Sequence, residues 1–473
     1  MAMSAAQPQS ARHGNRPPRR AGRRVVALVA TIGGLAVLGV GLAATAAGPV
    51  SNGPPVGGGP ARSGPGWHAS AAAGSPSTST LPSLGPGDSP GPGSSTAPTE
   101  PGTPTAAERH RAVLGVRLDA ELDRLRAKLA IPGVSVTILF PDGSTWSGGS
   151  GLADIATRMP VGPTTRFAFA SISKTFTSAL ILQLAGEGRL RLADSAAGLL
   201  PALRFVVDRR ITVGMLLDHT SGLADYFLNP KIDRPLQSRP STTWTPDLTL
   251  GYVGKRVAPP GRAFHYSNTN YFLLGLIAER VTGEPLGSSI RTRLLEPAGL
   301  AATWHQIDEP AAAPLAHGYR LRGTKLTAKP IDLSDGSGIA PFRSVVTAAG
   351  GAGAMAGTSD DLARWARALY GGRVLGPVGT ALLLSGFKPT TGYVLGVAYG
   401  YGVQAIAIDG HPSLGHSGRL LGFRGVVRHF ALDGLTIAVL TNQSRADPGE
   451  IVRALLSVAL PGPPACRICA VPA

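Results

Sequence analysis

Residues 167–184 read FAFASISKTFTSALILQL and place a lysine, Lys174, at the start of an apolar run. A charged side chain is costly to bury at such a position. Ser171 lies three residues earlier, and residues i and i+3 share one face of a helix, so Ser171 Oγ and Lys174 Nζ can meet. Burial lowers the pKa of a lysine, as a general base near neutral pH requires. The stretch therefore predicts a serine nucleophile with its base in the same helical turn.

The Ser-x-x-Lys spacing alone is a weak signal, because the chain contains a second copy, Ser385-Gly-Phe-Lys388. In that copy a glycine lies inside the spacing and Pro389 follows, so no helix can hold the pair together. Ser171 instead follows a strand-like segment and opens a helical one. This context favours Ser171 over Ser385 as the nucleophile.

Residues 264–271 read FHYSNTNY and place Tyr266-Ser267-Asn268 in a loop before the helical pattern NYFLLGLIAERVTG. A Tyr-x-Asn turn puts a phenol and an amide on the same side of the chain. The phenol can transfer a proton, and the amide can hold a lysine. The alternative is a loop tyrosine that packs on the core.

Residues 415–419 read GHSGR and precede the strand pattern GFRGVVRHFA. A glycine at a sheet edge, Gly418, allows a peptide-like substrate to approach the backbone closely. The next N–H, that of Arg419, can then face the reacting carbonyl as an oxyanion donor. The alternative is an ordinary glycine turn between strands.

Strand patterns occur near both ends of the globular region, with helical material between them. The opening helix is predicted from leucines at helical spacing between Leu114 and Leu129, and the closing helix covers 448–460. Strands are predicted at 131–140, 144–151, 422–432 and 435–442. This order predicts one α/β domain whose sheet takes strands from both termini.

The motifs SISK, YSN and HSG, in this order and spacing, resemble those of the penicillin-recognising serine hydrolases. The stretch LLDHTSGL at 216–223 is similar to the LLxHTSGL segment of the same family. Within that family, the sequence is most similar to class C β-lactamases and to the related D-alanyl-D-alanine carboxypeptidases and esterases. The resemblance covers roughly residues 107–460. It implies an α/β (α+β) fold of the β-lactamase/transpeptidase type, with a mainly antiparallel sheet flanked by helices and a helical subdomain.

The resemblance also implies roles for individual residues. Ser171 would be the acylated nucleophile and Lys174 its base. Tyr266 would transfer the proton, and Asn268 would orient the lysine and the substrate. No cofactor belongs to such a mechanism.

At the third motif, His416, Ser417 and Gly418 would line the substrate edge. The backbone N–H groups of Ser171 and Arg419 would form the oxyanion hole. Class C β-lactamases carry Lys-Thr-Gly here, so the histidine favours the carboxypeptidase branch over efficient β-lactam hydrolysis. The resemblance thus implies a serine peptidase or esterase, with a class C-like β-lactamase as the alternative.

Other functional classes fit the sequence less well. The ten histidines form no HxxxH or HxH grouping, so no metal site is predicted. The nearest match to a G-x-S-x-G nucleophile elbow, at 415–419, fails at its last position. The rival from another class is a catalytically silent penicillin-sensing or wall-binding protein on the same fold.

The N-terminal part of the chain predicts export. Residues 1–24 form a basic cytoplasmic tail, and Val25–Gly48 is an uncharged stretch of 24 residues. This length can cross a bilayer, so the stretch is a transmembrane signal anchor or a cleaved signal peptide. The domain at 107–460 is then expected outside the cytoplasm, at the cell membrane or secreted.

Two further segments have no predicted core. Residues 49–106 are rich in Gly, Pro and Ser and form a disordered linker. Residues 461–473 form a C-terminal tail in which Cys466 and Cys469 could close a local disulfide in an oxidising compartment.

The chain is basic, with 45 Lys and Arg against 28 Asp and Glu, and a net charge of +17. No basic motif with interleaved aromatic residues accompanies the charge, so nucleic acid is not a predicted partner. A basic surface also suits an anionic cell envelope. The expected partners are a small peptide, β-lactam or ester substrate, the peptidoglycan, and the membrane through the N-terminal segment.

Overall fold

The computed structural model describes residues 105–203, 207–310, 315–321, 329–390, 393 and 396–460. The basic tail, Val25–Gly48, nearly all of the predicted linker, and Cys466 and Cys469 lie outside these residues. Within the described ranges, no helix combines the length and the apolar character needed to cross a membrane.

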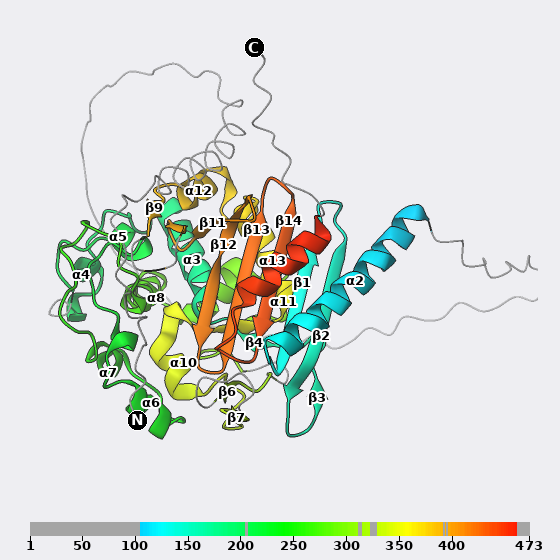
Figure 1. The fold of residues 1–473 in the computed structure, drawn as a ribbon. Coiled ribbons are helices and arrows are strands. Elements are labelled where there is room, and N and C mark those ends of the chain that lie inside the picture. Colours follow the sequence, from blue (N-terminus) through cyan, green and yellow to red (C-terminus); the bar gives the residue numbers. More distant parts are fainter. Residues whose placement is uncertain are drawn as a thin grey trace, which may run out of the picture. The chain divides into compact units, whose positions relative to one another are not determined.

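A nine-stranded antiparallel sheet forms the centre of the described domain (Figure 1). The first long strand, β1 (Gly133–Leu139), pairs with the last, β14 (Leu435–Thr441), in the middle of the sheet. The order across the sheet is β3 (Met159–Pro160), β2 (Thr145–Asp154), β1, β14, β13 (Phe423–Phe430), β12 (His411–Leu420), β11 (Gln404–Ile408), β10 (Ala398–Tyr399) and β9 (Lys388–Pro389). The predicted fold class is confirmed.

The sequence of β1, GVSVTIL, explains why each face of the sheet carries its own helices. Successive side chains of a strand point to opposite faces. Val134, Val136 and Ile138 join the apolar cluster beneath α2 (Ala106–Lys128) and α13 (Pro448–Ala459). Ser135 and Thr137 point the other way, and each lies 2.9 Å from Ser359 Oγ at the start of α11 (Ser359–Tyr370).

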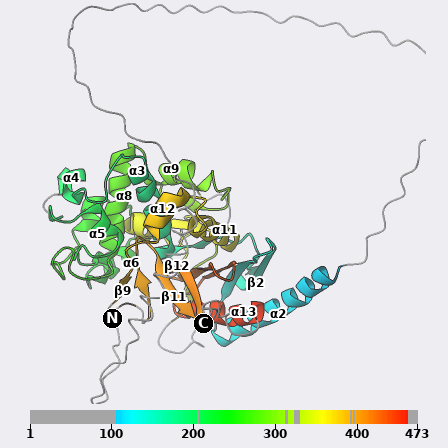
Figure 2. The same cartoon turned by 90° about the horizontal axis from the view of Figure 1, so that it is seen from above.

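The helices therefore form layers on both sides of the sheet. Figure 2 shows α2 and α13 on one side, with α3 (Lys174–Gly186) and α11 on the other. The remaining α-helices are α4 (Ala196–Leu199), α5 (Val213–Leu217), α6 (Asp233–Ser238), α7 (Pro246–Leu250), α8 (Asn268–Thr282), α9 (Leu286–Ile290), α10 (Arg343–Ala349) and α12 (Gly376–Leu383). Helices α4 to α8 gather beside the part of the sheet that contains β12, as the predicted helical subdomain (Figure 1).

Short elements complete the domain. A three-stranded sheet has the order β4 (Phe167–Ala168), β8 (Met355–Gly357) and β5 (Trp304–His305). A two-stranded sheet pairs β6 (Tyr319–Leu321) with β7 (Pro330–Asp332). Strand β4 leads directly into the serine motif, so its pairing with β8 fixes where that motif begins.

The start of the serine helix differs from the prediction. Residues Ala170–Ser173 form a 3₁₀ turn, and α3 itself begins at Lys174. Ala170 has a φ of +50°, a left-handed conformation that regular helix does not contain. The chain therefore enters the helix through a tight turn, with Ser171 on that turn rather than in the α-helix.

Candidate active site

Lys174 is completely buried, and its Nζ has three neighbours. Nζ lies 3.0 Å from Ser171 Oγ, 2.8 Å from Asn268 Oδ1 and 2.9 Å from the carbonyl oxygen of Ala352. Asn268 Nδ2 donates to an Asp225 carboxylate oxygen at 2.8 Å, which fixes the amide with its oxygen towards the lysine. A neutral amine has two N–H groups, and each can donate one hydrogen bond. Asn268 Oδ1 and the carbonyl oxygen of Ala352 accept these two bonds, so the lone pair is left for the Ser171 hydroxyl.

Two opposing effects, burial and the charge of one carboxylate, set the pKa of Lys174. Burial lowers the pKa of Lys174 to about 7, and the charge of Asp225 acts against this shift. Burial raises the pKa of Asp225, while the hydrogen bonds from Phe227 and Asn268 and the charge of Lys174 oppose that rise. Lys174 can therefore serve as a base near neutral pH.

Replacing Asp225 by asparagine is expected to shift the pH dependence of catalysis. The neutral form of Lys174 increases with pH, so kcat/KM should rise through an apparent pKa of about 7. Asp225→Asn removes the charge that raises this pKa, so the rising limb should move to lower pH by roughly one unit.

The measurement is kcat/KM against pH. Asp233→Asn, at an exposed carboxylate of the same cleft, is the control. An unchanged or upward-shifted limb would contradict this coupling.

Tyr266 lies beside the nucleophile and the base. Lys174 Nζ is 5.1 Å from the centre of its ring, and the ring stacks on Tyr393 at 4.7 Å. Burial raises the pKa of Tyr266 well above its ordinary value, although a hydrogen bond with Ser171 opposes the rise. The phenol therefore keeps its proton at neutral pH and can pass one on only while receiving another.

The third motif lies directly against the serine turn. A Cβ atom at Gly418 would come within 2.2 Å of the carbonyl oxygen of Phe169 and 3.1 Å of Ser171 N. Only glycine permits this approach. The structure thus brings strand β12 to the backbone of the residue that is predicted to attack.

The alternation of strand pairing places the N–H of Arg419 on the open side of β12. The N–H of Ser417 points away from β13, because it donates to Gln404 Oε1 at 3.0 Å. Residues two apart in an antiparallel strand point their N–H groups in the same direction. Beyond Gln404, β11 no longer pairs with β12, so the N–H of Arg419 faces an unpaired edge. This is the position that an oxyanion donor requires.

His416 is completely buried and neutral. Its Nδ1 lies 2.6 Å from the carbonyl oxygen of Ser417, so Nδ1 carries the proton, and Nε2 lies 3.0 Å from the Tyr399 hydroxyl. Burial lowers the pKa of His416 well below its ordinary value, and the charge of Lys174 adds to the shift. The motif therefore supplies no positive charge at neutral pH, unlike a lysine at this place.

Three further residues of the site were not predicted from the sequence. Asp225 holds Asn268, and it follows the LLDHTSGL stretch by two residues, which was the only signal available. Gln404 Oε1 accepts from Arg428 Nη2 at 2.7 Å, and Gln404 Nε2 donates to Ser417 Oγ at 3.2 Å. Arg428 is 6% exposed. Gln404 pairs with Gly415 and Gly415 pairs with Arg428, so Arg428 reaches Gln404 across the glycine on the same face of the sheet, and Gln404 in turn orients Ser417.

The second Ser-x-x-Lys copy forms no such site. Ser385 Oγ donates to the carbonyl oxygen of Leu382, and Lys388 Nζ forms an ion pair with Asp218. The two side chains have separate partners, as the glycine and proline in that stretch predict.

A cleft of about 510 Å³ opens beside Ser171 and Asn268. Its apolar lining includes Phe227, Leu228 and Leu236. Leu228 is 79% exposed, which leaves it available to a substrate. Asp233 and Arg419 also line the cleft and offer one charge of each sign. The cleft therefore suits a peptide-like molecule with an apolar side chain and a charged end.

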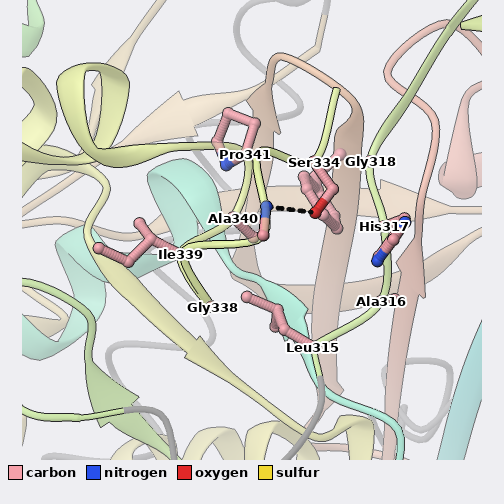
Figure 3. Close-up of a pocket in the computed structure, with 11 residues that line it drawn as sticks. Leu315, Ala316, His317, Gly318, Ser334, Gly338, Ile339, Ala340 and Pro341 are labelled. Atoms are coloured by element: carbon pink, nitrogen blue, oxygen red, sulfur yellow. Dashed lines mark hydrogen bonds between the residues drawn. The ribbon is translucent and has the colours of Figure 1, made fainter. Parts of the chain in front are cut away.

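A second pocket, shown in Figure 3, lies next to a group that has the donor types for a metal ion. Ligand atoms of Asp154, His317 and Asp332 lie within 4.8 Å of one another. His317 Nδ1 already binds Asp332 Oδ2 at 2.8 Å, and Thr157 Oγ1 donates to Asp154 at 2.6 Å. The pocket shares no lining residue with the cleft at Ser171. The pocket that His317 lines is thus separate from the cleft at the serine.

Comparison with known proteins gives consistent matches over the described domain. The sequence profile of the family named Beta-lactamase matches residues 118–459. Penicillin-binding protein 4 of Amycolatopsis lactamdurans is 28% identical over 340 residues, which cover 68% of this chain and 83% of that protein. A D-stereospecific amidohydrolase from Streptomyces sp. has a similar structure, with a TM-score of 0.61 and 27% identity over 72% of this chain and 97% of that one. D-amino acid amidase from Ochrobactrum anthropi SV3 shares the fold, with a TM-score of 0.64 and 24% identity over 73% and 98% of the two chains.

Proposed function

The chain belongs to the beta-lactamase family of serine hydrolases, and we propose that it is a peptidase or esterase of the D-alanyl-D-alanine carboxypeptidase type, acting outside the cytoplasm. The observation that carries this proposal is the set of three contacts at Lys174 Nζ. Two of these contacts use the N–H groups of the neutral amine, and the third directs its lone pair at Ser171.

The reaction follows from this geometry. Lys174 takes the proton of the Ser171 hydroxyl as Oγ attacks the substrate carbonyl. The N–H groups of Ser171 and Arg419 stabilise the negative oxygen of the tetrahedral intermediate. Tyr266 donates its proton to the leaving amine or alcohol and regains one from Lys174. The acyl-enzyme forms as the leaving group departs, and water releases the acid by the same proton path in reverse.

The substrate class is proposed from the cleft and from the relatives. The amidohydrolase from Streptomyces sp. is named D-stereospecific, and the relative from Amycolatopsis is named a penicillin-binding protein. The first name suits a D-configured amide substrate, and the second suits a site that accepts a β-lactam. Leu228 offers a contact to an apolar side chain, and the Arg419 guanidinium offers a partner for a terminal carboxylate. A neutral His416 argues against the charge pattern of Lys-Thr-Gly β-lactamases.

The location outside the cytoplasm is proposed from Val25–Gly48 and the arginines that precede it. Positive residues before an apolar stretch keep the N-terminus in the cytoplasm. Mass spectrometry of the mature N-terminus from the native host distinguishes a retained anchor from a cleaved signal. Accumulation of the unprocessed protein in the cytosolic fraction would contradict the proposal.

A substrate panel tests the function. The full-length protein is offered a D-Ala-D-Ala peptide, a D-amino acid amide, a short-chain ester and a β-lactam, and kcat/KM is measured for each. We expect turnover of the peptide, the amide or the ester to exceed that of the β-lactam. Faster turnover of the β-lactam would identify a β-lactamase instead. A stable acyl-enzyme without turnover on any substrate would identify a penicillin sensor.

A further inference from the structure

His219 is a completely buried histidine for which the reaction above has no role. Its Nδ1 lies 3.2 Å from the backbone N of Ser267 and 2.9 Å from Asn270 Nδ2. Ser267 is the central residue of the Tyr266-Ser267-Asn268 loop. The imidazole therefore contacts the backbone between the proton-transferring tyrosine and the asparagine that holds the lysine.

The hydrogen bonds fix the tautomer of this histidine. A backbone N–H can only donate, so Nδ1 accepts from Ser267. Asn270 Oδ1 accepts from the Ser221 hydroxyl at 2.6 Å, and Ser221 Oγ accepts the N–H of Leu223 at 3.1 Å. The amide of Asn270 thus turns its NH₂ group to His219, which gives Nδ1 a second donor. His219 is therefore neutral, with its proton on Nε2.

The surroundings of Nε2 also favour the neutral ring. Nε2 has no N or O partner among the described residues, and the rings of Tyr266, Tyr399 and Tyr271 lie 4.4, 4.9 and 5.2 Å from the imidazole, centre to centre. Burial lowers the pKa of His219 well below its ordinary value, and the charge of Lys174 adds to the shift. A protonated ring would place a second N–H against that of Ser267.

The backbone around His219 holds the same loop. His219 has a φ of +59°, and its carbonyl oxygen accepts the N–H of His265 at 2.8 Å. The carbonyl of Thr220 accepts the N–H of Gly261, also at 2.8 Å. A Cβ atom at Gly222 would come within 2.0 Å of the carbonyl oxygen of Ala258. The HTSG turn is therefore packed tightly along the segment that leads to Tyr266.

We propose that His219 is a positioning residue, whose unprotonated Nδ1 fixes Tyr266 and Asn268 by accepting the N–H of the residue between them. This inference rests on the proposed roles of Tyr266 and Asn268. The turn supplies the backbone contacts, and the imidazole supplies a side-chain contact to the centre of the loop. Without that acceptor, the Ser267 N–H is buried with no partner, and the loop is free to shift.

Two substitutions separate the acceptor from the backbone conformation. His219→Asn places Oδ1 close to the position of Nδ1, and asparagine tolerates a positive φ. His219→Gly also tolerates this φ but offers no acceptor. The measured quantities are the rate at which a fluorophosphonate labels Ser171 and the melting temperature of each protein.

We expect His219→Asn to label Ser171 within about threefold of the wild-type rate. His219→Gly should label at least roughly 30-fold more slowly while remaining folded, because a displacement of about 1 Å in a catalytic group can cost a hundredfold. Equal rates for folded His219→Gly and the wild type would overturn the proposal. If both variants lose labelling rate equally, and the loss matches the fraction of each protein that is unfolded, the proposal is also overturned. Such a result would indicate that His219 has a structural role alone.

A second measurement reads the tautomer of His219 directly. Nitrogen-15 NMR of the protein with labelled histidine should contain a ring signal with an unprotonated Nδ1 and a protonated Nε2 that is present in the wild type and absent in His219→Asn. A protonated Nδ1 at neutral pH in the ring whose signal is lost in His219→Asn would overturn the proposal. If the wild-type protein itself fails to label, the proposed function fails, and the tautomer of His219 is still measured independently.

Discussion

Ser171→Ala is expected to lower kcat/KM by roughly 10⁴-fold or more, because a nucleophile that forms a covalent intermediate has no substitute in the site. The hydroxyl is in hydrogen-bond contact with Lys174 Nζ at 3.0 Å and lies on the turn that Gly418 approaches. Alanine removes only this oxygen and keeps the backbone N–H of the oxyanion hole. Labelling by a fluorescent penicillin or a fluorophosphonate should disappear, while the melting temperature changes little.

The chain provides a matched control for this experiment. Ser385 also stands three residues before a lysine, but its hydroxyl donates to the backbone of Leu382. Ser385→Ala should therefore retain labelling and turnover. Labelling that persists in Ser171→Ala, or disappears in Ser385→Ala, would show that the nucleophile has been assigned wrongly.

Lys174→Met is expected to lower the rate of acylation by about 10²–10⁴-fold, the usual contribution of a general base. Methionine has a similar length and is apolar, so it fits the fully buried position without carrying a charge into it. The change leaves Asn268 Oδ1 and the carbonyl of Ala352 without their donor, which should cost some stability. The measurement is the pre-steady-state rate of acyl-enzyme formation, together with the melting temperature.

The rising limb of the pH profile gives an independent readout for the same variant. Residual activity of Lys174→Met should no longer rise through pH 7, because the group with a pKa of about 7 has been removed. Lys255→Met, at an exposed lysine, should leave both the rate and the profile unchanged. A Lys174→Met protein that keeps the wild-type profile would show that another group is the base.

The parts of the site that the sequence predicted are those that depend on local spacing. Ser171 and Lys174 meet because they are three residues apart, across the tight turn that leads into α3. Tyr266 and Asn268 both lie beside Lys174 because one residue separates them at the start of α8. The apolar alternation of β1 likewise follows from its own seven residues. Each of these signals needs no knowledge of how distant segments pack.

The supporting residues were not predictable, because their roles depend on distant segments. Asp225 contacts Asn268 from 43 positions away, and Arg428 reaches Gln404 across 24 positions. A buried arginine or aspartate has no periodic signature, and its partner becomes known only when the strands and helices are placed. His219 was part of a quoted motif, but only the structure shows that its Nδ1 reaches the loop.

The pairing of β1 with β14 has a consequence for how the chain folds. Val134 and Thr441 are partners in the register, so the middle of the sheet joins segments that are about 300 residues apart. Contacts between such distant segments form slowly, because the whole intervening loop must be closed first. During synthesis, β1 has no partner on this side until the last strand has emerged. A chain truncated before residue 435 is then left with an open, apolar strand edge, and such edges promote aggregation.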